Sequence, residues 1–213
     1  QELTEMNTLT VSEVKFHGLG PDSAIAAVVP GLREHLIRLT DILEIINKES
    51  DSLALVLSGG INYYTGQFFD IPAITAAAHG AGAYAGFDLA HVAGNIPVEL
   101  HNWDVDFAVW CSYKYLNGGS GAVGGAFVHE RHASDRGFAR LGGWWSNEES
   151  ARFKMENGFV PKKEAEGWQQ STAQVFNMVS LKASLELFEA AGIGALRKKS
   201  QDMTNTWSFC CKN

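Results

Sequence analysis

The sequence is poor in the features that mark secreted, membrane-spanning and metal-binding proteins. Its 213 residues include only three cysteines, Cys111, Cys210 and Cys211, and none of them makes a CxxC pair. No apolar run approaches the ~18 residues that a membrane helix needs. The first residues lack the basic stretch and apolar core of a signal peptide. We therefore expect a cytoplasmic protein with reduced thiols, no membrane partner and no metal centre.

Positive charge is also scarce. Lysine and arginine number 17 against 24 acidic residues, which gives a net charge of −7. A surface with this balance repels phosphate backbones, so we expect no nucleic-acid partner. The length and the 46% hydrophobic content suit a globular domain that buries a sizeable core.

Apolar runs alternate with stretches of helical spacing along most of the chain. Strands are expected at 53–57, 84–88, 106–110 and 125–129. Helices are expected from Leu32 to about Lys48–Asp51, from Asp70 to Gly80, and over 175–199. Residues 1–31 and 144–172 lack a clear period, and the latter segment is a loop region with aromatics. The alternation predicts an α/β fold with a mostly parallel central sheet covered by helices.

Three chemically interesting segments follow these strands. In parallel sheets ligands bind beyond the carboxyl ends of the strands, which predicts that Ser58, Asp88 and residues 112–114 lie along one edge. Asp88 closes a strand as FDLAH, with His91 three residues later. The carboxylate could bind a metal, a ribose hydroxyl or a cationic ring nitrogen, or it could cap a helix. Taken alone, His91 is more typical of a structural histidine.

Lys114 raises a similar choice, because it ends an apolar strand and precedes a glycine-rich loop, in FAVWCSYKYLNGGSGAVGG. Its stem could be buried with a solvated ammonium, or its amine could form a Schiff base with a cofactor aldehyde. Small neighbours leave room for such a cofactor. An acid and a lysine on neighbouring strand ends are what pyridoxal phosphate requires. The glycine-rich stretch matches neither the P-loop nor the GxGxxG pattern.

Longer stretches of sequence resemble the kynureninase family. They are YYTGQFFDIPAIT (63–75), GFDLAHVAGNIPVELHNWDVDFAVWCSYKYLNGGSGAVGGAFVHERH (86–132), GGWW (142–145) and ARFKM (151–155). The resemblance runs from about residue 3 to about residue 199. It implies the pyridoxal-phosphate fold type I, a homodimer, and hydrolysis of L-kynurenine or 3-hydroxy-L-kynurenine to L-alanine and anthranilate or 3-hydroxyanthranilate, a step in tryptophan catabolism and NAD biosynthesis.

The resemblance also implies roles for particular residues. Lys114 holds the cofactor and moves the substrate α-proton, while Tyr113 binds the phosphate and donates a proton late in the cycle. Asp88 pairs with the pyridinium nitrogen, and His91 contacts the cofactor beside it. Phosphate or cofactor contacts are further implied for Leu9, Thr10, Ser58, Trp144 and Thr172. We expect domains at 1–31 (an N-terminal segment), 32–172 (the cofactor-binding core) and 173–213 (a helix leading to a truncated small domain).

Departures from the family pattern leave alternatives open. A segment with a cofactor-stacking aromatic is missing after Val11, Gly59 aligns with the phosphate-binding serine better than Ser58, and Thr172 replaces an asparagine. The chain also stops before the arginine that clamps the substrate carboxylate. We therefore expect a truncated kynureninase with an internal deletion. The alternatives are an impaired member that only binds cofactor or pairs with a full-length subunit, and a desulfurase- or transaminase-like activity.

Overall fold

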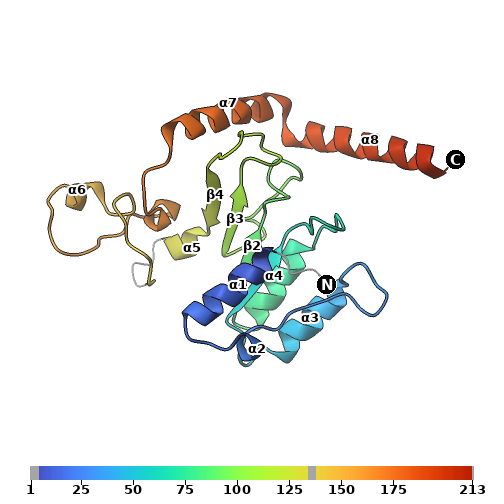
Figure 1. Ribbon diagram of the computed structural model, residues 1–213, viewed down its shortest axis with the longest axis horizontal. Coiled ribbons are helices and arrows are strands. Elements are labelled where there is room, and N and C mark those ends of the chain that lie inside the picture. Colours follow the sequence, from blue (N-terminus) through green and yellow to red (C-terminus); the bar gives the residue numbers. More distant parts are fainter. Residues whose placement is uncertain (1–4, 134–137, 213) are drawn as a thin grey trace. The chain divides into compact units, whose positions relative to one another are not determined.

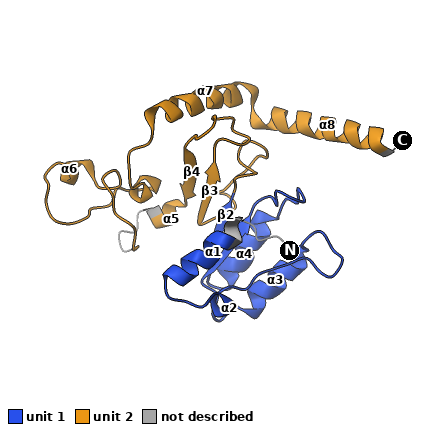
Figure 2. Cartoon of the chain, viewed as in Figure 1, with its two compact units in different colours: residues 1–88 blue, residues 89–213 orange. Residues whose placement is uncertain are grey.

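The computed structural model describes residues 5–133 and 138–212 of the chain. It divides into two compact units, residues 1–88 and 89–213 (Figure 2). The domain boundaries expected at residues 31/32 and 172/173 stay predictions. Within the described residues, no helix combines the length and apolarity required to cross a membrane.

The first unit contains a parallel strand pair joined by a helix (Figure 1). Its elements are α1 (Glu5–Phe16), α2 (Pro21–Ala24), α3 (Leu39–Lys48), β1 (Leu55–Gly59), α4 (Ile71–Gly80) and β2 (Tyr84–Asp88). Leu55 of β1 lies opposite Tyr84 of β2, and Gly59 lies opposite Asp88. Both strands therefore end at the same edge, as parallel pairing requires.

Helix α4 carries much of the core of this unit. Asp70 caps the helix by accepting a 3.0 Å hydrogen bond from the Ala73 backbone N–H, and Pro72 lies in the first turn. Ile71 and Ile74 on α4 are fully buried, as is Phe87 on β2. Each such side chain stabilises the fold by about 1.5–3 kcal/mol, so this packing fixes the end of β2.

The second unit is built on an antiparallel strand pair. Its elements are β3 (Phe107–Cys111), β4 (Gly124–Val128), α5 (Glu130–Ala133), α6 (Glu149–Arg152), the 3₁₀ helix η1 (Ala165–Trp168), α7 (Val175–Ala191) and α8 (Ile193–Lys212). Trp110 lies opposite Gly125, and a Cβ at Gly125 would overlap the Trp110 indole. Glycine at position 125 thus leaves room for the indole ring of the neighbouring strand.

The segment between β4 and α7 includes a loop whose two ends meet, which we call the 145–170 loop. The Trp145 N–H donates to the Gln170 carbonyl at 3.2 Å, and the Lys162 N–H donates to the Ser146 carbonyl at 2.8 Å. Residues 147 and 161 form an isolated antiparallel bridge. The loop region expected at 144–172 also contains the short helices α6 and η1.

Several helix expectations are wrong. Residues 1–31 were expected to be irregular, yet α1 and α2 form there. The apolar residues Leu9 and Phe16 of α1 are exposed, so the helix has no core-facing stripe that could produce a periodic signal. The next helix begins at Leu39 rather than Leu32, because the chain turns first and Arg33 has a φ of +66°.

The helix expected over 175–199 is in fact two helices. Gly192 separates α7 from α8 with a φ of +75°, a value that a continuous right-handed helix does not contain (Figure 1). The apolar positions behind the prediction, from residue 175 to residue 188, all lie within α7, so they held no information about where that helix ends. The expected strand positions are close to those observed, and β2 matches its expected range at both ends.

Candidate functional site

A close polar contact joins two of the predicted site residues, Lys114 and His91. The Nζ of Lys114 lies 2.9 Å from the Nε2 of His91. This distance is that of a hydrogen bond between the lysine amine and the imidazole, whose donor is set by the ring tautomer. Both side chains are half-buried, which limits competition from water. The ring of Tyr115 flanks His91 edge-on, with 6.0 Å between centroids.

His91 is placed by a turn at the start of the second unit. The Leu89 N–H donates to the Val109 carbonyl of β3 at 2.8 Å, and the Leu89 carbonyl accepts from Val92 at 2.9 Å. Leu89 and Val92 are both buried. Gly94 has a φ of +80°, and a Cβ there would come within 2.9 Å of the Tyr115 carbonyl. This close packing brings the two chain segments that carry His91 and Lys114 together.

Lys114 is held from its own side by main-chain hydrogen bonds. Its carbonyl accepts from the Asn117 N–H at 3.0 Å, and the Ser112 carbonyl accepts from the Gly118 N–H at 2.8 Å. The Ser112 side chain is fully buried and donates to the Val123 carbonyl. The chain therefore turns back on itself directly after Lys114, which leaves little freedom in the lysine backbone.

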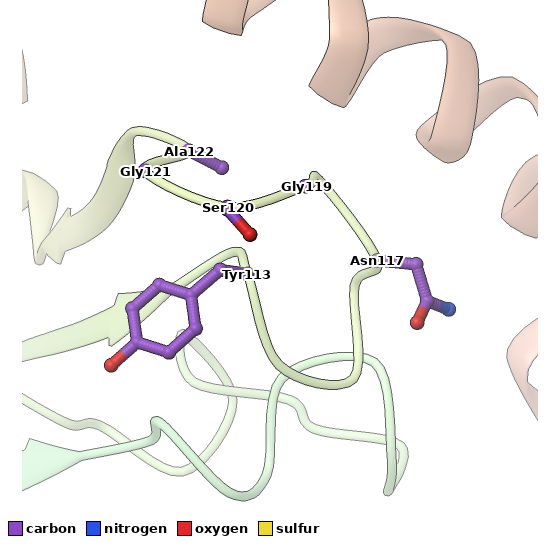
Figure 3. A pocket seen from close by; sticks show the side chains of 6 residues that line it. All are labelled: Tyr113, Asn117, Gly119, Ser120, Gly121 and Ala122. Carbon is purple, nitrogen blue, oxygen red and sulfur yellow. The ribbon is translucent and has the colours of Figure 1, made fainter.

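The glycine-rich loop lines a cavity of about 610 Å³ beside these residues. Its lining consists of Tyr113, Asn117, Gly119, Ser120, Gly121 and Ala122. In Figure 3 the side chains of Tyr113 and Asn117 point away from each other on either side of the loop. The Tyr113 side chain is about half exposed, and the Lys114 Nζ lies 5.9 Å from its ring centroid. The cavity wall thus carries a phenol, a group that can donate or accept a hydrogen bond.

The remaining predicted residues of the first unit lie on separate elements. Asp88 is the last residue of β2 and is half-buried, and its carbonyl accepts from the Gly60 N–H at 2.8 Å. No helix begins in the described residues after it, through residue 100, so the capping alternative does not apply. Ser58 lies within β1 and donates to the Gly59 carbonyl at 3.1 Å. Leu9 and Thr10 lie on α1.

Two further predicted residues lie in the second unit. Trp144 directly precedes the 145–170 loop, where its ring meets Phe153 edge-on at 5.4 Å and the Arg152 guanidinium at 5.6 Å. Thr172 is exposed just before α7. The structure thus brings His91, Tyr113 and Lys114 together, and places Trp144 among aromatic and cationic neighbours of its own.

Sequence reasoning missed a set of polar side chains on α7 that bind the glycine-rich loop. Asn177 donates to the Gly121 carbonyl, Ser180 to the Gly118 carbonyl at 3.0 Å, and Ser184 to the Leu116 carbonyl at 2.6 Å. The three donors are spaced by three and four residues, which places them on one helix face. The spacing of these polar residues can be seen in the sequence and could have indicated a polar contact face. The prediction considered only the apolar positions of this helix.

A second polar cluster surrounds Asp106, which is almost fully buried at the end of the turn before β3. One carboxylate oxygen accepts from Arg131 at 2.7 Å and from His132 at 2.6 Å. Nearby, burial lowers the pKa of His129, and the positive charge of Arg131 lowers it further. Within the described residues, no group of three or more His, Cys, Asp or Glu side chains is arranged to hold a metal ion.

Comparisons with known proteins identify the family of the chain. The family described as Aminotransferase class-V matches residues 23–208. A kynureninase from Koribacter versatilis is 50% identical over 93% of this chain and 47% of its own length. A kynureninase from Rattus norvegicus is 46% identical over 95% of this chain and 43% of its own length. The resemblance predicted from sequence is therefore confirmed, although the chain spans about half the length of the curated relatives it matches.

Solved structures show the same fold at lower sequence identity. A cysteine desulfurase from Thermococcus onnurineus matches 95% of this chain and 48% of its own, with a TM-score of 0.72 and 18% identity. An alanine–glyoxylate aminotransferase from Nostoc matches 96% of this chain and 51% of its own, with a TM-score of 0.62 and 14% identity. These likenesses confirm the expected fold class.

Proposed function

Since the chain belongs to the aminotransferase class-V family, we propose that it forms part of an enzyme that hydrolyses L-kynurenine or 3-hydroxy-L-kynurenine with pyridoxal 5′-phosphate. The products are L-alanine and anthranilate or 3-hydroxyanthranilate. The observation that carries this proposal is the 2.9 Å hydrogen bond between Lys114 and His91 beside an open cavity. Supporting it, curated kynureninases are close to 50% identical over more than nine tenths of the chain.

The residues present fit the cofactor chemically. Lys114 supplies an amine for the aldehyde, and the cavity beside Tyr113 has the volume of a small-molecule site. When bound, pyridoxal phosphate supplies an electron sink for bond cleavage in an amino acid. Asp88 would keep the ring nitrogen charged. As the family resemblance implies, Leu9, Thr10, Ser58, Tyr113 and Trp144 would contact the phosphate, and Thr172 would face the cofactor.

The chain's own residues have distinct tasks in this proposal. His91 makes a hydrogen bond with the Lys114 amine and so directs it, which leaves fewer amine orientations to be lost before the reaction. Lys114 holds and moves a proton at Nζ. Tyr113 donates a proton from its phenol at the cavity wall. The half-buried setting of Lys114 and His91 limits solvent access to the moving proton.

A second candidate function is cofactor binding without turnover, alone or beside a full-length subunit. The observation that favours it is in the sequence, because the segment that carries a cofactor-stacking aromatic in the family is missing after Val11. A homodimer is proposed for the catalytic form, supported by exposed apolar side chains on α7 and α8. A cytoplasmic location is proposed because all three cysteines are free thiols.

The test of both functions uses the full chain, Lys114→Ala, and Lys182→Ala as the matched control on the exposed face of α7. Wild type and Lys182→Ala should gain a visible absorbance band with pyridoxal phosphate, and Lys114→Ala should not. Borohydride reduction followed by mass spectrometry should place the added pyridoxyl mass on Lys114. An unchanged band in Lys114→Ala, or mass on another lysine only, would contradict the proposal.

Turnover is measured separately by anthranilate fluorescence after L-kynurenine is added to the same samples. Fluorescence that rises with wild type and Lys182→Ala, but not with Lys114→Ala, supports hydrolysis. A cofactor band with no anthranilate supports the second candidate, because the amine then binds the cofactor without completing the reaction.

A further inference from the structure

Helix α7 is attached to the loop after Lys114 through side-chain donors and main-chain acceptors. The donors Asn177, Ser180 and Ser184 share one face of the helix. Their acceptors are carbonyls of residues 116, 118 and 121, within a stretch that has few side chains of its own. A glycine-rich loop cannot anchor itself by apolar packing, so its carbonyls are the groups through which another element can hold it.

A cavity along α7 and the start of α8 reaches the glycine-rich loop at one residue, Asn117. The cavity has a volume of about 500 Å³, and the rest of its lining is Ser180 and Ser184 of α7, Leu196 of α8 and four further α7 residues. Dispersion contacts are lost across such a space. The 2.6 Å bond from Ser184, which is part-buried, is therefore a principal attachment of the loop to the helix.

The anchored carbonyls lie directly beside the backbone groups that fix Lys114. Residue 116 is two positions after the lysine, and the amide of Gly118 binds the Ser112 carbonyl while its own carbonyl binds Ser180. The Asn117 N–H between them binds the Lys114 carbonyl. Any movement of the loop away from α7 thus pulls on both hydrogen bonds that enclose the lysine.

We propose that Asn177, Ser180 and Ser184 are positioning residues for the Lys114 amine. By holding the loop, they keep the amine on His91 and aim it at the cavity that Tyr113 lines. The part of the inference that concerns the cofactor aldehyde rests on the proposed function. The part that concerns the restraint of the amine stands on the hydrogen bonds alone and can be measured without cofactor.

The first measurement is the rate at which acetic anhydride acetylates Lys114, relative to Lys182 in the same sample, read by peptide mass spectrometry. Ser184→Ala should raise this ratio about fivefold, the factor that corresponds to loss of one neutral hydrogen bond. Ser180→Ala, whose donor is more exposed, should raise it less. Ser184→Thr keeps the hydroxyl and should restore the wild-type ratio. Ser52→Ala, which removes a similar serine-to-carbonyl bond from an exposed turn, should leave it unchanged.

The second measurement is the apparent Kd for pyridoxal phosphate from the visible absorbance band. Ser184→Ala should weaken binding about fivefold, while Ser184→Thr and Ser52→Ala match wild type. An acetylation ratio that is the same in wild type, Ser180→Ala and Ser184→Ala overturns the inference, whatever the cofactor does. If wild type shows no band, the proposed function fails, and the acetylation ratios still decide the inference.

Discussion

Lys114 and His91 show how single residues acquire a functional geometry from backbone turns. Each of the two side chains is carried by a tight turn of the backbone at its base. The sequence predicted both residues and their chemistry from FDLAH and SYKYLN. It could not predict the distance between their nitrogens, because that distance depends on Gly94 packing against the Tyr115 carbonyl.

His129 gives a pH-dependent prediction at the residue scale. Burial, followed by the charges of Arg131 and His101, lowers its pKa in the folded state, while Asp104 and Glu130 act in the opposite direction. The unfolded chain, with a histidine pKa of about 6.5, therefore binds more protons than the folded one. The contribution of His129 to the free energy of unfolding is therefore complete above a pH of about 6.5. Below that pH the free energy of unfolding should fall.

The check is urea unfolding of wild type and His129→Gln at neutral and mildly acid pH. The variant should lose less unfolding free energy between the two conditions, because the titrating group is gone. His35→Gln, at an exposed position, should lose as much as wild type. A wild-type loss equal to that of His129→Gln would show that this ring does not contribute.

Individual elements follow sequence rules where a local signal exists. The cap at Asp70 and the strand at Tyr84–Asp88 are confirmed because capping chemistry and a short apolar run mark them directly. Helix α1 was missed because its apolar side chains are exposed. The attachment of α7 to the glycine-rich loop was missed because it depends on main-chain carbonyls, whose direction no residue type encodes.

The break between α7 and α8 yields a prediction with a matched control. Gly192→Ala places a Cβ at a φ of +75° with nothing within 4 Å, so the cost is conformational. It should lower the free energy of unfolding by about 1–2 kcal/mol. Gly194→Ala also meets nothing within 4 Å and lies in α8 without a positive φ. It should raise that free energy by about 0.5–1 kcal/mol.

Chemical denaturation of both variants, followed by circular dichroism, measures these opposite signs. Equal effects would mean that the left-handed conformation of Gly192 is not maintained in solution. In that case the helix would run on through residue 192, as expected from the sequence.

On the scale of the whole molecule, the family and fold class were predictable because long motifs carry them. The sequence did not predict that the site residues are divided between two compact units. Asp88 is the last residue of one unit and His91 lies near the start of the other, although only two residues separate them in the chain. Two residues that are close in sequence can follow the same strand, but their closeness does not predict whether they belong to the same compact unit.

Exposed apolar side chains on the last two helices predict that the chain associates with itself. Phe176 on α7 is 90% exposed and Trp207 on α8 is 69% exposed, and such surfaces favour burial against a second molecule. Sedimentation velocity should show a concentration-dependent increase in mass. Phe176→Ser combined with Trp207→Gln should reduce it, whereas Leu32→Ser, at a residue 95% exposed in the first unit, should not. A chain that sediments as a monomer at every concentration would contradict this expectation.

The meeting of residues 145 and 170 has a practical consequence for anyone who modifies this protein. A loop whose two ends lie side by side can accept inserted residues without displacing the chain before or after it. The exposed turn at Asn157–Gly158, where the glycine φ is +130°, is accordingly a natural insertion point for an affinity peptide or a fluorescent reporter.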